Sequence, residues 1–124
     1  MIAADTSSIS SYFKGEPGAD VRLLDAALTN GILRLPPVVL TELLSDAGLE
    51  STLAPFLAQF KMLHLTDGYW ERAGKSRRQL AIAGLKVKIA DALIAQSCID
   101  HDVPLITRDN GFRRFAKHCG LKLA

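Results

Sequence analysis

The side chains best suited to chemistry in this sequence are four carboxylates, each inside its own short phrase. Asp5 stands in Ala-Asp-Thr-Ser-Ser, Glu42 in Leu-Thr-Glu-Leu-Leu, Asp91 in Ile-Ala-Asp-Ala-Leu-Ile-Ala and Asp109 in Ile-Thr-Arg-Asp-Asn-Gly-Phe. Carboxylates confined to one pocket repel one another strongly unless cations lie between them, and hard divalent ions such as Mg²⁺ take oxygen ligands. If one fold brings the four together, the sequence therefore indicates a metal-dependent hydrolase.

Each acid taken singly has a simpler interpretation. Asp5 could be a helix N-cap, Asp91 a first-turn acid that complements the helix dipole, Glu42 a solvated helix position, and Asp109 a turn residue. Taken together they favour a site. Glu42 and Asp91 each lie among apolar neighbours, and a buried unpaired carboxylate is costly unless a metal or hydrogen-bond donors compensate it.

The elements that must position these acids alternate along the chain. Short apolar runs predict strands at 2–4, 32–35, 62–65, 104–107 and 121–123. Helical periods, caps and glycine stops predict helices at about 5–14, 20–30, 37–48, 51–60, 68–83, 88–101 and 112–118. Thr66 and Asp67 are expected to cap the fifth helix, and Ile89, Ile94 and Cys98 to face inward from the sixth. Strands alternating with helices predict an α/β domain whose central parallel sheet, of four to five strands, is covered on both faces.

This architecture predicts that the acids converge. Right-handed crossovers place the carboxyl end of every strand, and the start of every following helix, at one edge of the sheet. Asp5 and Asp109 each follow a strand, Glu42 lies little more than a turn into a helix, and Asp91 lies in the first turn of another. If the first and fourth strands are neighbours, Asp5 and Asp109 lie side by side.

Length, composition and charge narrow the function classes. At 124 residues, with 48% apolar and 23% charged residues, the chain is expected to form one globular domain over 1–124. Its net charge of +2 does not by itself indicate nucleic-acid binding. Basic residues are nevertheless grouped, five of them between Lys75 and Lys88 without an acid, and four more from Arg108 to Lys117. These groups are either solvated helix faces or phosphate-binding surfaces, and beside a carboxylate pocket they favour a polyanionic substrate.

Other kinds of site receive no support. Cys98 and Cys119 form neither a disulfide framework nor a zinc pattern, and the three histidines lack ligand spacing. The chain starts directly with a short apolar segment, without a signal peptide or a long apolar span, so a cytoplasmic protein with no membrane partner is expected.

The four acidic phrases resemble those of the PIN-domain nucleases, especially the VapC-type toxins of bacterial toxin–antitoxin pairs, over essentially the whole chain. Residues 5–7 look like the family's N-terminal Asp-Thr-Ser, and 39–43 like its glutamate-bearing helix. Residues 91–95 are similar to its most specific phrase, and 107–109 with Phe112 to its closing one. The segment 2–4 is less bulky than the usual strand, and Gly111 stands where an additional acid is often seen.

The resemblance implies a three-layer α/β/α PIN-like domain that uses Mg²⁺, or Mn²⁺ in its place, to hydrolyse phosphodiester bonds of RNA. Asp5, Asp91 and Asp109 would coordinate metal, and Glu42 would either ligate metal or orient the attacking water; whether one or two ions bind is left open. The supporting polar residues would be Ser7, Thr107 and Asn110. Candidates for holding the RNA backbone are Lys86, Lys88, Arg108 and Arg113.

The family further implies a homodimer and a cognate antitoxin, an arginine of which could pair with the carboxylates and displace metal. Two alternatives from other classes remain. A haloacid-dehalogenase-type phosphotransferase would need a second aspartate where Ser7 stands. A non-catalytic PIN-like RNA-binding or scaffold protein would bind no metal at the four acids.

Overall fold

The centre of the molecule is a parallel sheet of three strands in the order β2-β1-β3. The computed structural model describes residues 1–124, the side chain of Glu50 excepted. The strands are β1 (Ile2–Ala4), β2 (Leu33–Arg34) and β3 (Leu105–Ile106). Ile2 lies opposite Leu33, and Ala4 opposite Ile106, so the predicted first and fourth strands are indeed neighbours.

The predicted α/β class with a parallel sheet is confirmed, but the sheet is narrower than the four to five strands expected. Within the described residues, the third and fifth predicted strands are reduced to isolated parallel bridges, of Met62 with Leu35 and of Leu123 with Leu105. Each of these outer segments hydrogen-bonds to one neighbour only, because no strand lies beyond it to extend the ladder.

The helices lie where the sequence predicts them, with differences at their ends. Their bounds are α1 Thr6–Phe13, α2 Ala19–Thr29, α3 Pro37–Leu44, α4 Glu50–Leu53, α5 Tyr69–Ile82, α6 Ile89–His101 and α7 Arg113–Cys119, with short 3₁₀ helices η1 Ala54–Gln59 and η2 Asn110–Phe112. The third helix ends four residues earlier than predicted. The predicted helix at 51–60 is divided because Pro55 has no N–H with which to continue an α-helical ladder.

The helix starts show which capping predictions hold. Asp5 is the N-cap of α1, and its carboxylate accepts from the N–H of Ser8 at 3.0 Å. Thr66 and Asp67 do not cap α5 with their side chains, contrary to the prediction. The residue before α5 is Gly68, whose φ of +80° is open to glycine at little cost, and the backbone makes the turn instead.

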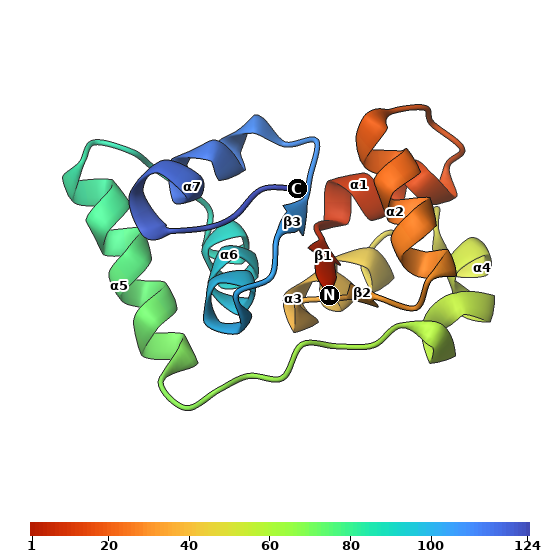
Figure 1. Cartoon of the computed structure of the whole chain (residues 1–124), viewed down its shortest axis with the longest axis horizontal. Coiled ribbons are helices and arrows are strands. Elements are labelled where there is room, and N and C mark those ends of the chain that lie inside the picture. Colours follow the sequence, from red (N-terminus) through yellow and green to blue (C-terminus); the bar gives the residue numbers. More distant parts are fainter.

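Helices cover the sheet on both sides, as Figure 1 shows with α1 and α2 on one side and α5, α6 and α7 on the other. The strand residues Ala3, Ala4 and Leu105 are wholly buried between them. Most of α6 is buried as predicted, including Ile94 and Cys98, but Ile89 is 60% exposed because it lies at the very start of the helix, beside exposed Trp70. None of the helices in the described chain has the length and apolar character needed to cross a membrane.

Candidate metal-binding active site

Four separate segments bring the predicted acids to one cleft of about 300 Å³ at the carboxyl edge of the sheet. Asp5 comes from the end of β1, Glu42 from α3, Asp91 from the first turn of α6 and Asp109 from the residues after β3. The remaining lining residues are Thr6, Ser7, Ser10, Lys88, Ile94 and Phe112. The convergence expected from the crossover rule is therefore present in the structure.

Asp5 is the buried centre of the site, with only 2% of its surface exposed. Its carboxylate accepts from the hydroxyl of Ser7 at 2.8 and 2.9 Å, from the N–H of Ser8, and from the hydroxyl of Thr107 at 2.5 Å. Burial raises the pKa of Asp5, these hydrogen bonds oppose the rise, and the charge of Asp109 adds to it. The donors hold the carboxylate in one orientation without neutralising it.

Asp91 shows the electrostatic coupling of the site most directly. Its pKa is raised first by burial and next by the charge of Asp109, with smaller contributions from Glu42 and Asp5. Lys88, one turn before it, lowers the pKa. Three other carboxylates thus act on Asp91, and a bound cation would relieve the repulsion among them.

Thr6 is a supporting residue that the sequence analysis missed. Its hydroxyl donates to the carboxylate of Glu42 at 2.6 Å across 36 positions of sequence. The available signal was its place directly after Asp5, where the first helical residue must also face the sheet edge. Together Thr6 and Ser7 orient one carboxylate each from the first turn of α1.

Thr107 links the two acids of neighbouring strands. Its hydroxyl donates to Asp5 and also accepts from the backbone N–H of Asp109 at 2.9 Å. The side chain of Asp109, which is exposed, accepts from the N–H of Gly111 at 2.8 Å. Asn110 is exposed at the start of η2 and does not line the cleft.

The donor set fits a hard divalent cation because it consists of carboxylate oxygens with hydroxyls behind them. Among the described residues, no three acidic, histidine or cysteine side chains already converge at metal-ligand distances. Ligation by three of the acids would therefore require rotation of side chains. Asp109 and Asp91 are the least constrained, since Asp5 and Glu42 are fixed by side-chain hydroxyls.

Of the four predicted RNA-contacting cations, the structure brings one to the cleft, Lys88. Lys86 lines an adjoining groove, and Arg113 lies in a hollow beside Lys117. The guanidinium of Arg108 is directed away, onto the carboxylate of Asp20 at 2.8 and 3.0 Å.

The ion pair of Arg108 with Asp20 supports the site from behind. Asp20 also accepts from the hydroxyl of Ser8, and the guanidinium additionally donates to Glu16 at 3.1 Å. Arg108 lowers the pKa of Asp20 to about 2. Glycine at position 18 leaves room for the pair, because a Cβ there would lie 2.4 Å from the Asp20 carboxylate and 2.9 Å from the guanidinium and would force one of them to shift. The pair ties the start of α2 to the segment that carries Asp109.

Comparison with known proteins decides the family. A family model described as the PIN domain matches residues 2–118. The chain belongs to the PIN-domain family. The resemblance found in the sequence is thereby confirmed. The members of this family are, in general terms, nucleases.

Solved structures show the same fold for this PIN domain. It superimposes with a TM-score of 0.79 and 22% identity on a chain of VapBC2 from Rickettsia felis, bound to a DNA fragment from their promoter, over 100% of this chain and 98% of that one. It superimposes with a TM-score of 0.70 and 23% identity on a chain of FitAcB from Neisseria gonorrhoeae, over 99% and 96%. A comparison with curated proteins gives no match.

Proposed function

We propose that this PIN domain is a Mg²⁺-dependent endoribonuclease, with Mn²⁺ able to substitute, that hydrolyses phosphodiester bonds of RNA. The observation that carries the proposal is the gathering of Asp5, Glu42, Asp91 and Asp109 in one cleft from four distant segments. A structural explanation of each acid on its own does not account for their common destination at the sheet edge.

In this proposal Asp5, Asp91 and Asp109 hold the metal, and Glu42 either joins them or orients the attacking water. When bound, a divalent ion supplies activation of water and neutralisation of charge on the phosphate. The chain's own residues supply orientation. Ser7 and Thr107 fix Asp5, Thr6 fixes Glu42, and Lys88 places a cation beside Asp91 where a substrate phosphate would lie.

We further propose that the protein is the toxin of a toxin–antitoxin pair and acts in the cytoplasm as a homodimer. This is supported by the fold shared with chains of the VapBC2 and FitAcB complexes. A cognate antitoxin is expected to be encoded beside this chain, as a small reading frame with a DNA-binding N-terminus. Co-expression of that product should yield a stable complex in which RNA cleavage is suppressed.

The nuclease proposal is tested with synthetic single-stranded RNA oligonucleotides, incubated with purified protein in Mn²⁺, in Mg²⁺ and in a chelator. Cleavage is expected with either ion and not with the chelator, and it should be lost in Asp91→Asn. Calorimetric titration with Mn²⁺ separates the alternative. Absence of both cleavage and Mn²⁺ binding at the four acids would overturn the proposal in favour of a non-catalytic RNA-binding or scaffold protein.

A further inference from the structure

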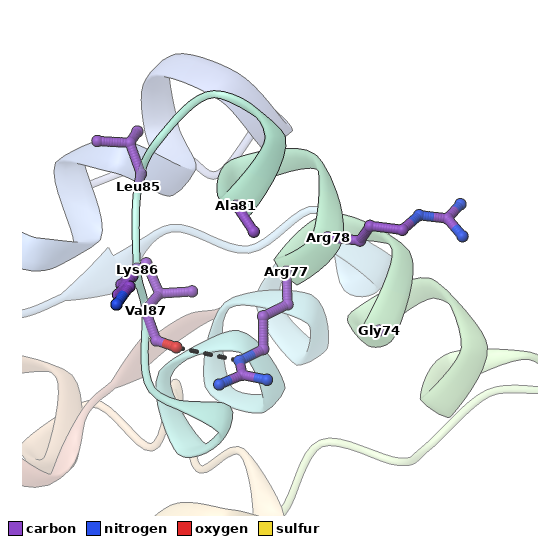
Figure 2. Close-up of a pocket in the computed structure, with 7 residues that line it drawn as sticks. All are labelled: Gly74, Arg77, Arg78, Ala81, Leu85, Lys86 and Val87. Carbon is purple, nitrogen blue, oxygen red and sulfur yellow. Dashed lines mark hydrogen bonds between the residues drawn. The ribbon is translucent and has the colours of Figure 1, made fainter.

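A second hollow, of about 420 Å³, lies between α5 and the segment that leads into α6. It is lined by Gly74, Arg77, Arg78, Ala81, Leu85, Lys86 and Val87. Figure 2 shows Arg77 extending from α5 toward Val87, while Arg78 points outward into solvent. The groove therefore has an apolar floor and cationic side chains at its rim, two features that serve different parts of a nucleotide.

The charge around this groove has one sign. The sequence has no acidic side chain between Glu71 and Asp91, and none after Asp109. In the described part of the chain, the ion pairs of basic residues involve Lys14, Arg72, Arg108 and Lys122, none of which lines the groove. A surface of this kind attracts phosphate groups and repels acidic neighbours.

The groove and the carboxylate cleft are joined by a short, fixed piece of backbone. The Nε of Arg77 donates to the carbonyl of Val87 at 3.0 Å, and an Nη of Arg114 donates to the carbonyl of Lys86 at 2.8 Å. The segment is thereby held from both α5 and α7. Lys86 lines the groove and Lys88, two residues on, lines the cleft, so at most about 7 Å of backbone separates the two positions.

We propose that this groove binds a nucleotide of the single-stranded RNA near the bond that is cut, with the base against Ala81, Leu85 and Val87 and the flanking phosphates on Arg78 and Lys86. The inference rests on the proposed function and extends it to the path of the substrate. Single strands suit the groove because their unstacked bases can enter an apolar hollow, whereas the bases of a duplex are paired and stacked. Arg77 and Arg114 hold the loop through the carbonyl groups of Val87 and Lys86.

The test uses a fluorescent single-stranded RNA oligonucleotide and its anisotropy, in the Asp91→Asn background so that the RNA stays intact. Arg78→Ala with Lys86→Ala removes two exposed cations that make no hydrogen bond in the structure as described. The log–log slope of affinity against salt should become shallower by about 1.4, and affinity at 0.1 M salt should fall by on the order of tenfold. The matched control is Arg22→Ala with Lys61→Ala, which removes the same charge from exposed positions outside the groove and should leave the slope nearly unchanged.

The outcomes are distinguishable from those of the nuclease proposal. If the wild-type protein binds RNA through the groove but does not cleave it, the nuclease proposal is refuted and the proposed RNA-binding groove is retained. Equal slopes for the groove variant and the control overturn the groove, even if cleavage is confirmed. If the groove variant keeps its affinity for RNA but loses binding to poly-L-glutamate, the RNA proposal is also overturned. The surface would then be assigned to an acidic polypeptide. If the groove substitutions weaken binding of an RNA duplex as much as binding of the single strand, the groove does not select single strands. That outcome overturns this part of the proposal.

Discussion

At the residue scale, the site depends on hydroxyl groups as well as on the four acids from which the sequence analysis started. Two of the four carboxylates in the cleft accept hydrogen bonds from hydroxyls, namely Glu42 from Thr6 and Asp5 from Ser7 and Thr107. Such donors set the direction of a carboxylate, and those on Asp5 oppose the rise in its pKa that burial causes. The acids supply the charge, and the hydroxyls determine where that charge points.

Thr107 is the supporting residue whose loss should matter most, because its hydroxyl serves Asp5 and the backbone of Asp109 together. Thr107→Val keeps the shape and removes both bonds, and we expect Mn²⁺ affinity and RNA cleavage to fall by roughly 10- to 100-fold. Thr107→Ser, which keeps the hydroxyl, should restore most of both. Calorimetric Mn²⁺ titration and initial cleavage rates provide the measurement. Equal losses in the Val and Ser variants would assign the effect to packing of the methyl group.

Asp91→Asn should separate stability from catalysis. The fold raises the pKa of Asp91 above its usual value of 3.8, so the folded state binds a proton more readily than the unfolded state and stability falls as pH rises through that window. At neutral pH without divalent ions, Asp91→Asn should therefore raise the thermal midpoint by roughly 2–5 °C, and the gain should disappear at about pH 4 and below. Thermal unfolding in chelator at both pH values measures this. A lowered midpoint at neutral pH would instead identify Asp91 as a structural helix-start residue.

At the element scale, the segment after β3 is held in place by α1 and the start of α2. Arg108 reaches Asp20, and Asp20 accepts from Ser8 in the first turn of α1. This contact fixes the neighbour of Asp109 rather than Asp109 itself, whose exposed side chain is held only by the N–H of Gly111. The pairing also explains why Arg108 is directed away from the cleft, where the sequence analysis expected an RNA contact.

Asp20→Asn should weaken this link between elements. The pKa of Asp20 is lowered to about 2 from 3.8, so the carboxylate stabilises the fold above its unfolded pKa, and that stability is lost as pH falls from about 4 toward 2. At neutral pH we expect the midpoint to fall by on the order of 5 °C. The control is Asp46→Asn, whose pairing with Lys14 is longer, at 3.8 Å, and more exposed, and whose midpoint should hardly move. Similar midpoints for the two variants would show that the Arg108 pair adds nothing beyond an exposed contact.

At the scale of the whole molecule, apolar side chains remain exposed between the residue before β2 and the helix η1. Ile32 is 43%, Leu44 54% and Leu57 37% exposed. They fall in the segments 32–44 and 51–60, both of which are rich in apolar residues. Such residues on one part of a small domain are commonly covered by a second copy.

We therefore predict a homodimer of twice the 13.4 kDa chain mass, measured by light scattering at micromolar concentration. Leu44→Arg should shift the mass to that of a monomer. Ile82→Arg is the matched control, because Ile82 is 80% exposed at the end of α5 and the dimer should persist. In Figure 1, α5 lies at the left edge of the molecule, whereas α4 lies at the right. A wild-type protein of monomer mass would contradict the prediction outright.

Much of this protein follows from the sequence alone. The four acids, the alternation of strands and helices, and the convergence at one sheet edge follow from local signals and the handedness of crossovers. The support of Asp5 by Ser7 and Thr107 was expected from the family resemblance. Local signals suffice here because caps, helical periods and strand ends are encoded within a few neighbouring residues. The right-handed crossover, which brings distant segments to one sheet edge, is a general property of parallel sheets.

Only the tertiary structure determines the contacts and strand lengths that depend on residues far away in sequence. Arg108 pairs with Asp20, 88 positions away in sequence, and does not line the cleft. Of the four cations that were expected to contact RNA, only Lys88 lines it. The outer strands shrank to single bridges because a strand's length depends on what lies on both its sides. Thr6 reached Glu42 only once α1 and α3 had packed together, since a hydrogen bond 36 residues apart leaves no local trace in the sequence.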